Sequence, residues 1–377
     1  MINFNLDERT PNIIKVIGIG GGGGNAVEYM YTQGIHDVDF VICNTDDQVL
    51  KNTPIPNRIR LGNEQTIGLE LGLGAGNDPE VGRQAAEDSK EEIKAMLNKD
   101  TKMAFITATL GGGTGTGAAP VVARMAKEMG ILTVGIVAVP ERTEGEKRVM
   151  QAMNGLQLLK EHVDSLIVID NENISRIYDD LPISDGFNKA NEVLNIAAKG
   201  IAEIITLPGY VNVDFADVKT VMTDSGVAIM GSAKASGEDR ARQVIADALE
   251  SPLLNNSDIL GAQNILLNIT SGKEEIRTDE MKEITSYILR KVGNSAAVIW
   301  GVGTDEKLED AISVTVIATG FPETEVDLLA QKNTGQRGTD RIVLTEEEVV
   351  VKPDLTDAQI RKLEATPAYE RRNLRMN

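Results

Sequence analysis

The sequence predicts an α/β protein in which helices cover both faces of a parallel sheet. Short apolar runs alternate with helical segments through the first half of the chain. Runs that are apolar throughout are typical of strands buried on both sides. A long amphipathic helix follows near the middle, and a smaller α/β domain comes after it. The last segment, residues 322–377, is polar and charged, which predicts a flexible tail.

The first half contains five predicted strands, two of which end in glycine-rich turns. Periodic apolar residues predict helices over residues 26–31 and 118–129, directly after those two turns. The strands are expected at residues 15–19, 40–43, 103–107, 131–139 and 165–169.

A long helix is predicted at the centre of the chain, because apolar residues recur there every three or four positions. The stripe comprises Phe187, Ala190, Leu194, Ala197, Ile201 and Ile204. We expect Ser184 to be its N-cap and Pro208-Gly209 to end it. A helix of this length separates two domains well, so we divide the chain into residues 1–183, 184–209, 210–321 and 322–377.

The second half is less rich in glycine and predicts the smaller domain. A charged helical segment covers residues 238–249, and a further helix covers 278–292. Strands are expected at residues 264–269, 296–300 and 312–319.

The tail ends in a basic segment that begins with a helix signal. Thr356 and Gln359 have the spacing of a capping box. Five basic residues against two acids follow from Arg361 onward. On an acidic protein this pattern favours a docking peptide, with a solvated, ragged end as the alternative.

Composition places the chain among globular proteins and limits its partners. Its 377 residues are 41% hydrophobic and 25% charged, with a net charge of −19. Such a charge repels nucleic acid and anionic lipid, so we expect neither as a direct partner. No segment has the apolar length of a membrane span or a signal core, which predicts a soluble, cytoplasmic protein without direct membrane insertion.

The cysteine and the histidines suggest no chemistry. Cys43 is the single cysteine and lies in an apolar run, so a buried, inert thiol is the better interpretation than a reactive one. His36 and His162 are too isolated to predict a metal cluster.

Three glycine-rich turns are the main functional signal. Residues 18–23 satisfy G-x-G-x-x-G directly after a strand, a pattern that many dinucleotide enzymes share. Residues 111–117 are more informative, because glycines let phosphate approach the backbone and two threonine hydroxyls are near. Residues 72–77 form a third such segment. We expect the three turns to hold one polyphosphate.

Several nucleotide-binding classes can be compared with these turns. A Walker A loop needs a Lys-Ser or Lys-Thr after the glycines, which is missing. A nicotinamide-dependent oxidoreductase would need an acid where the second strand ends in Asn44-Thr45. That enzyme class remains a rival on the first turn alone, and a polymerising scaffold without catalysis is a second rival.

Three segments carry a resemblance to a known family. They are GGGTGTG at residues 111–117, KVIGIGGGGGNAV at 15–27 and NVDFADVKTVM at 212–222. Together they resemble the tubulin/FtsZ superfamily of cell-division GTPases, over about residues 13–321. The resemblance implies a Rossmann-like GTP-binding domain, a C-terminal GTPase-activating domain, and GTP or GDP with Mg²⁺. It also allows for a monovalent cation such as K⁺.

The same resemblance implies which residues bind the nucleotide. The phosphate loops would be Gly21, Gly22, Gly23, Gly24 and Asn25 with Gly111, Gly112, Gly113, Thr114, Gly115, Thr116 and Gly117. The γ-phosphate-sensing loop would be Gly74, Ala75, Gly76 and Asn77; Asn44 and Asp46 would lie near the nucleotide, with Asp46 at the metal. Glu144 and Arg148 would contact ribose and phosphate, and Asn171, Phe187 and Asn191 the guanine. Residues 139–143 carry charges where family members often have aromatic or small polar residues.

The residues for hydrolysis are expected elsewhere in the chain. Asp214 and Asp217 are spaced to share one face at the start of a helix, a spacing that fits simple helix capping equally well. The resemblance implies instead that Asn212, Asp214 and Asp217 act in the nucleotide pocket of the next subunit. The protein would then assemble head to tail into filaments of a cytokinetic ring at mid-cell. Its terminal peptide would dock membrane-tethering division proteins such as FtsA.

Overall fold

The computed structural model describes residues 12–35, 37–63, 65–66, 72–178, 180–206, 210–211, 213–250, 259–293 and 296–321, with the backbone alone for 183, 184 and 187. All of these residues belong to one compact unit, residues 1–335. The predictions for the tail, residues 322–377, and for Pro208-Gly209 lie outside the described residues.

The larger sheet is parallel throughout, as the sequence predicts. Its order is β3-β2-β1-β4-β5-β6-β7, which contains the 3-2-1-4-5-6 order of Rossmann-like sheets. Its strands are β1 Ile14–Ile19, β2 Val38–Asn44, β3 Asn57–Arg60, β4 Met103–Thr109, β5 Leu132–Val139, β6 Ser165–Asp170 and β7 Gly226–Val227. The two edge strands, β3 and β7, escape the sequence prediction because they are short and β3 carries two arginines.

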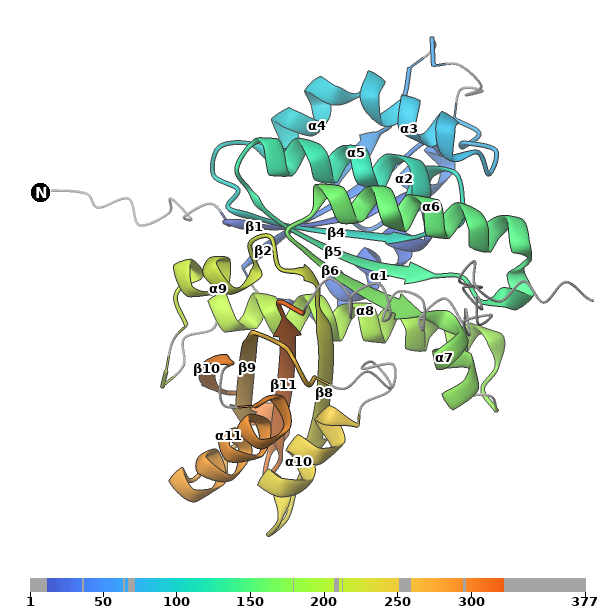
Figure 1. Cartoon of the computed structure of the whole chain (residues 1–377). Coiled ribbons are helices and arrows are strands. Elements are labelled where there is room, and N and C mark those ends of the chain that lie inside the picture. The colour runs from blue at the N-terminus through green and yellow to red at the C-terminus, as the bar shows by residue number, and fades with distance from the viewer. Residues whose placement is uncertain are drawn as a thin grey trace, which may run out of the picture. The chain divides into compact units, whose positions relative to one another are not determined.

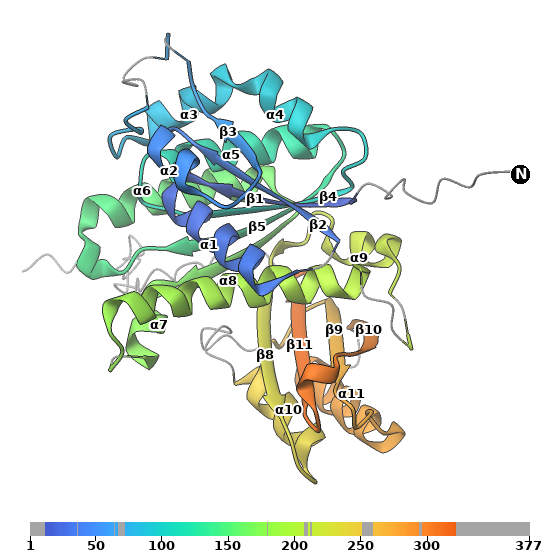
Figure 2. The ribbon, with the colours of Figure 1, turned by 180° about the vertical axis from the view of Figure 1, so that it is seen from behind.

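Helices cover both faces of this sheet (Figures 1 and 2). On one face lie α1 Gly20–Gln33 and α8 Ile183–Thr206, and on the other α3 Pro79–Asp88, α4 Lys90–Leu97, α5 Thr114–Glu128 and α6 Glu146–His162. Short helices α2 Asp47–Asn52, η1 Arg142–Glu144 and α7 Asn171–Ile177 follow the carboxyl ends of strands. The two faces therefore have separate apolar cores, as expected for a sheet buried on both sides.

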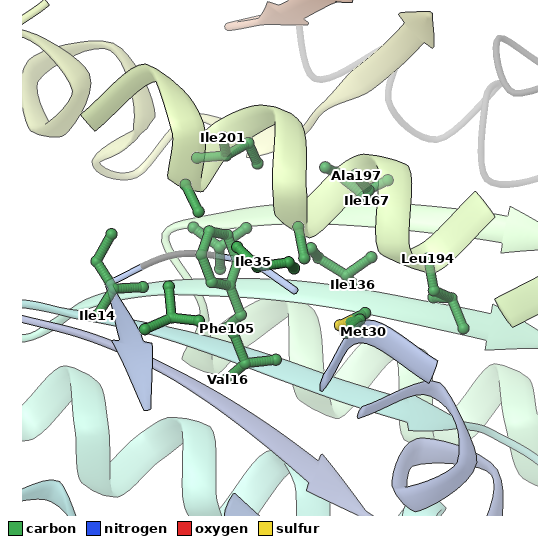
Figure 3. Close-up of a cluster of buried hydrophobic side chains, with 14 of the residues drawn as sticks. Ile14, Val16, Met30, Ile35, Phe105, Ile136, Ile167, Leu194, Ala197 and Ile201 are labelled. Atoms are coloured by element: carbon green, nitrogen blue, oxygen red, sulfur yellow. The ribbon is translucent and has the colours of Figure 1, made fainter. Parts of the chain in front are cut away.

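The central helix α8 packs its predicted apolar stripe onto the sheet. Leu194, Ala197 and Ile201 are buried and face Ile136 and Ile167 (Figure 3). The same cluster includes residues of the second sheet, such as Leu266, so α8 contacts both sheets. The predicted N-cap at Ser184 is wrong: α8 begins at Ile183, directly after Pro182, whose fixed φ suits the entry to a helix.

The smaller sheet is mixed, with order β10-β9-β11-β8. Its strands are β8 Ile229–Ala235, β9 Asn264–Ser271, β10 Ala297–Thr304 and β11 Ile312–Thr319, and its helices are α10 Arg240–Leu249 and α11 Thr278–Val292. The predicted helix over residues 278–292 and the strand over 312–319 are confirmed, and α10 begins two residues later than expected. The remaining elements are α9 Phe215–Met222, which precedes β7, and η3 Glu306–Leu308.

Candidate nucleotide site

Two helix N-termini meet where the strand order reverses. α1 follows β1 and α5 follows β4, and these neighbouring strands send their helices to opposite faces of the sheet. The backbones approach closely, because a Cβ on Gly20 would lie 2.8 Å from the Gly115 nitrogen. Gly20 also has a positive φ of 72°, which favours glycine. Such a switch point is where open α/β sheets bind ligands.

The first glycine run lies inside a helix rather than in a loop, contrary to the sequence prediction, whereas the second is a turn over residues 111–113 that continues into a helix. Residues 20–24 form the first turns of α1, and Gly115 and Gly117 lie in α5. Steric crowding explains their composition: a Cβ on Gly22 would overlap Thr109, and one on Gly23 would overlap the Thr107 carbonyl. The glycines are therefore required for packing as well as for phosphate access.

The first turns of α1 and α5 have free backbone N–H groups. Neither helix has a side-chain N-cap or an acid in its first turn. The first four N–H groups of a helix have no partner within it, and the helix dipole adds positive potential there. A methyl group at exposed Gly21 would meet no atom within 4 Å, so this position is open. Together the two termini make an anion site without a basic side chain.

The second glycine turn is held rigidly by its threonines. The hydroxyls of Thr45 and Thr114 are 2.7 Å apart and buried, which joins the end of β2 to the start of α5. The Thr116 hydroxyl accepts a hydrogen bond from the Gly111 N–H at 2.8 Å. Both predicted phosphate-binding hydroxyls therefore have partners within the protein, and their contact with phosphate stays a prediction.

The third glycine segment packs against both other parts of the site. Leu73 pairs with Asp46 through an isolated β-bridge, and the Asp47 N–H donates to the Gly72 carbonyl at 3.3 Å. On the other side, a Cβ on Gly113 would lie 2.9 Å from the Ala75 Cβ. Residues 72–77 thus lie between the end of β2 and the start of α5, and their contact with the γ-phosphate stays a prediction.

Asn44 and Asp46 follow β2 at the same edge. Asn44 is buried, and its side-chain oxygen accepts from the Asp46 N–H at 3.3 Å. One Asp46 oxygen caps α2 by accepting from the N–H groups of Gln48 and Val49. No group of three metal-ligating side chains occurs among the described residues. Mg²⁺, which usually keeps waters and takes substrate phosphates as ligands, would fit here with the second Asp46 oxygen as its one protein ligand.

Glu144 and Arg148 form an ion pair beside the second glycine turn. Their charged atoms are 3.1 Å apart, and both side chains are partly exposed. A second Glu144 oxygen accepts from the Glu141 N–H at 3.0 Å. Gly111 packs against this pair, because a Cβ added at Gly111 would lie 2.9 Å from the Arg148 Cγ. The structure thus brings the predicted sugar-side residues next to the predicted phosphate turn.

The residues predicted for the base lie on α7 and α8, which pack together. Asn171 is the first residue of α7, and its side-chain oxygen is buried without a hydrogen-bond partner among the described residues. Asn191 is half-buried in α8. Phe187 belongs to α8, but its side chain lies outside the described part. The unpaired Asn171 oxygen can accept a hydrogen bond from a ligand.

Asp170 is a site residue that the sequence analysis missed. It ends β6 and caps α7, accepting from the Glu172 N–H at 2.9 Å. Burial raises the pKa of its carboxyl to about 6, and the negative charge of Glu172 adds to that effect. The sequence did contain a signal for Asp170: it is an acid at the end of a predicted strand, directly before a predicted base-binding asparagine.

The predicted hydrolytic residues lie at the other end of the sheet. Asp214 caps α9 by accepting from the Ala216 N–H, and Asp217 lies in the first turn; both are exposed. Asn212 lies outside the described residues. α9 leads into the amino end of β7, which runs parallel to β6. The glycine turns follow the carboxyl ends of β1 and β4, so the two groups occupy opposite edges (Figure 1).

The fold and its paired helix termini define a Rossmann-like protein that binds a nucleotide polyphosphate. The sequence pattern of the Tubulin/FtsZ family, GTPase domain, matches residues 13–179, and that of the FtsZ family, C-terminal domain, matches residues 226–322. The chain belongs to the FtsZ family and is a GTPase. The nicotinamide-dependent class is thereby excluded.

Individual relatives agree with this assignment. The cell division protein FtsZ of Porphyromonas gingivalis is 47% identical over 324 residues, 85% of this chain and 70% of that protein. That of Buchnera aphidicola subsp. Baizongia pistaciae is 46% identical over 323 residues, 85% of this chain and 82% of its own. The empty FtsZ dimer of M. jannaschii has a TM-score of 0.76 and 42% identity, covering 83% of this chain and 89% of its own. CetZ1 of Haloferax volcanii, at 21% identity, has the same fold: its TM-score is 0.72, over 86% of this chain and 99% of its own.

Two predictions about cysteine and membrane can be compared with the structure. Cys43 is fully buried, and burial raises its thiol pKa to about 12, which confirms an inert thiol. Among the described residues, no helix has both the length and the apolar character needed to span a membrane.

Proposed function

We propose that this GTPase assembles head to tail into filaments of the cytokinetic ring and hydrolyses GTP between subunits. One subunit would supply the glycine turns that hold the nucleotide. The next would supply Asp214 and Asp217, together with Asn212, to orient the attacking water. Mg²⁺ at Asp46, with a monovalent cation such as K⁺, would neutralise phosphate charge during the reaction.

The observation that carries the proposal is the separation of the two groups within one chain. The glycine turns with free N–H groups lie at the carboxyl ends of the parallel strands. The exposed carboxylates of α9 lie at the opposite edge of the sheet, near the amino ends of the strands. A chain built this way does not bring Asp217 to its own nucleotide. Translation of one subunit onto the next would join the two edges, and such a contact repeats without closing.

A dilution experiment tests the shared site. GTPase turnover per subunit should rise steeply above a critical protein concentration, while the dissociation constant for GTP stays the same. Phosphate release gives the turnover per subunit, and a fluorescence binding assay across the same dilution series gives the dissociation constant for GTP. Equal turnover per subunit in strictly monomeric and in concentrated protein would contradict hydrolysis between subunits.

The cellular part of the proposal concerns the terminal segment. We infer that its basic end, beyond residue 361, docks membrane-tethering division proteins such as FtsA and so brings the filaments to mid-cell. Removing residues 356–377 should abolish co-sedimentation with FtsA and leave GTP-dependent filaments visible by electron microscopy. Unchanged binding of FtsA by the shortened chain would refute this role.

A further inference from the structure

A groove of about 460 Å³ lies on the face of the sheet that α5 covers, between α3 and α6. One end of the groove is lined by Asp78 and Thr116, close to the glycine turns, and it extends along α6 to His162. Pro120, Val121 and Leu158 supply apolar lining, and the Leu158 side chain is 49% exposed. The groove thus has both the size and the apolar surface of a small-molecule site.

Two hydrogen-bond acceptors belong to residues that line this groove. The Gln151 Oε1 atom is buried and has no partner among the described residues. The Thr116 carbonyl lacks its helical donor, because the residue four positions later is Pro120, which has no N–H. Buried acceptors are normally satisfied, so the Gln151 oxygen beside this cavity calls for a donor from a ligand or water.

The arginines and glutamates of the groove already pair with one another, and the Asp78 carboxylate caps α3 by accepting from the Glu80 N–H at 2.9 Å. Arg83 donates to Glu80 at 2.9 Å, and Arg124 donates to Glu87 at 2.7 Å. These pairs leave no uncompensated cation for an anionic ligand. The chemistry of the groove therefore favours a compact apolar molecule that carries an N–H or O–H group.

The two acceptors belong to residues that also hold the nucleotide loops. The Gln151 Nε2 atom donates to the Asn77 carbonyl at 3.3 Å, at the end of the third glycine segment. The Thr116 hydroxyl accepts from Gly111 in the second turn. Only glycine fits opposite Thr116 on α6, since a Cβ on Gly155 would overlap the threonine methyl group. A ligand that moves Gln151 or Thr116 must therefore move a segment that surrounds the phosphates.

We propose that this groove is a second binding site, for a small apolar molecule with a hydrogen-bond donor, and that its occupation changes the affinity for GTP. The groove shares Thr116 and Gly117 with the predicted phosphate turn at one end, but it extends beyond that turn along α6 to His162. Coupling passes through Gln151 to Asn77 and through Thr116 to Gly111.

Cysteine tethering can test the proposal on the full chain, because the native Cys43 is buried and unreactive. Asn154→Cys places a thiol in the groove three residues from Gln151, on the same side of α6. Gln157→Cys is the matched control, exposed on the same helix and outside the groove. Both variants are modified with 2-aminoethyl methanethiosulfonate, which adds a donor, or with the ethyl reagent, which does not.

The aminoethyl adduct at position 154 should change the dissociation constant for GTP by about fivefold, the scale of ordinary allosteric coupling. The ethyl adduct should have a smaller effect, and both adducts at position 157 should have none. Free benzylamine should slow the modification of Asn154→Cys and not that of Gln157→Cys. GTP affinity that is unchanged by a fully modified Asn154→Cys protein, or equal protection at both positions, would overturn the proposal.

A second variant tests whether the change in GTP affinity comes from filling the groove or only from a local structural disturbance at position 154. Leu158→Cys, modified with benzyl methanethiosulfonate, fills the apolar part of the groove from the next turn of α6. It should change GTP affinity in the same direction as the aminoethyl adduct, and no change would count against the proposal. These measurements use monomeric protein and binding alone, so they do not depend on filament assembly.

Discussion

The helices that face the nucleotide begin differently from the helix that carries the carboxylates. α1 and α5 have no side-chain cap and no acid in the first turn, and their glycines are fixed by close packing. α9 is capped by Asp214 and has Asp217 in its first turn, and both are exposed. α10 also lacks both a side-chain cap and an acid in its first turn, so what distinguishes α1 and α5 is that their uncapped termini meet at one point, whereas the carboxylates of α9 are exposed to solvent. One edge of the sheet is thus built to receive phosphate and the other to present negative charge.

The largest effect on GTP turnover should come from removing the exposed carboxylate of Asp217. We expect Asp217→Ala to lower GTP turnover about 100-fold, the scale of losing a group that positions or activates the attacking water. GTP affinity should stay the same, because the carboxylate lies at the opposite edge from the turns of its own chain. Phosphate release and nucleotide binding measured on one preparation provide the comparison.

Asp279→Ala is the matched control, since Asp279 is an exposed acid in the first turn of α11. Its loss should cost only the helix-dipole contribution of about 0.5 kcal/mol and leave turnover unchanged. Loss of GTP binding in Asp217→Ala would place that carboxylate in its own nucleotide pocket and end the contrast between the two edges.

Phosphate binding at the uncapped N-terminus of α1 can be tested by substituting two neighbouring glycines. Gly22→Ala would force a methyl group into Thr109, and we expect it to destabilise the fold by about 2 kcal/mol. Gly21→Ala meets no protein atom, so it should leave the free energy of unfolding nearly unchanged and still weaken GTP binding. Urea denaturation and nucleotide binding separate the two effects. Equal GTP affinity of Gly21→Ala and the unchanged protein would show that no ligand approaches this turn.

Much of this architecture was predictable from local pattern. The runs at residues 15–19 and 103–107 are apolar apart from Lys15 and Thr107, so they identified the central strands β1 and β4. The stripe from Leu194 to Ile204 identified α8, because burial on one face leaves a helical period. Edge strands such as β3 carry no such signal, since arginines occupy half of its positions.

The sequence predicted which glycine-rich segments form the candidate nucleotide site, but not the backbone conformation that they adopt. Glycine runs are expected in loops on helix propensity, yet Gly22 and Gly23 lie in α1, where the Thr109 side chain and the Thr107 carbonyl leave no room for a larger residue. That reason is a tertiary contact with β4, which a local pattern does not contain. The buried position of Asp170 is likewise a product of packing, and its altered pKa follows from it.

A smaller effect is expected at the rim of the nucleotide site. Arg148→Ala removes the partner of Glu144 and a side chain that packs on Gly111. The pair is partly exposed, so stability should fall by about 0.5 kcal/mol or less. GTP affinity should fall by about tenfold if the guanidinium contacts phosphate, an ordinary value for one charge-assisted hydrogen bond. Lys273→Ala, which breaks an exposed ion pair with Glu309 in the smaller domain, is the control and should leave GTP affinity unchanged.

The smallest effect should be a pH dependence of stability that arises at Asp170. Its folded-state pKa of about 6 lies above the ordinary aspartate pKa of 3.8, so the folded protein retains this proton where the unfolded chain has lost it. Stability from this group is therefore complete below pH 3.8 and falls as pH rises to about 6. Because the side chain is partly exposed, we expect a loss of about 1 kcal/mol rather than the full linkage value.

Asp170→Asn should remove this dependence while keeping the cap on α7, since asparagine is an equally good N-cap. The measurement is the urea midpoint at several pH values between 4 and 7 for both proteins. The two curves should converge at low pH and separate as pH rises, with the variant more stable at neutral pH. Parallel curves would mean that Asp170 is ionised across the whole range. Burial of Asp170 at the carboxyl ends of the strands would then have no electrostatic cost, and the difference in charge between the two edges would rest on the exposed carboxylates of α9 alone.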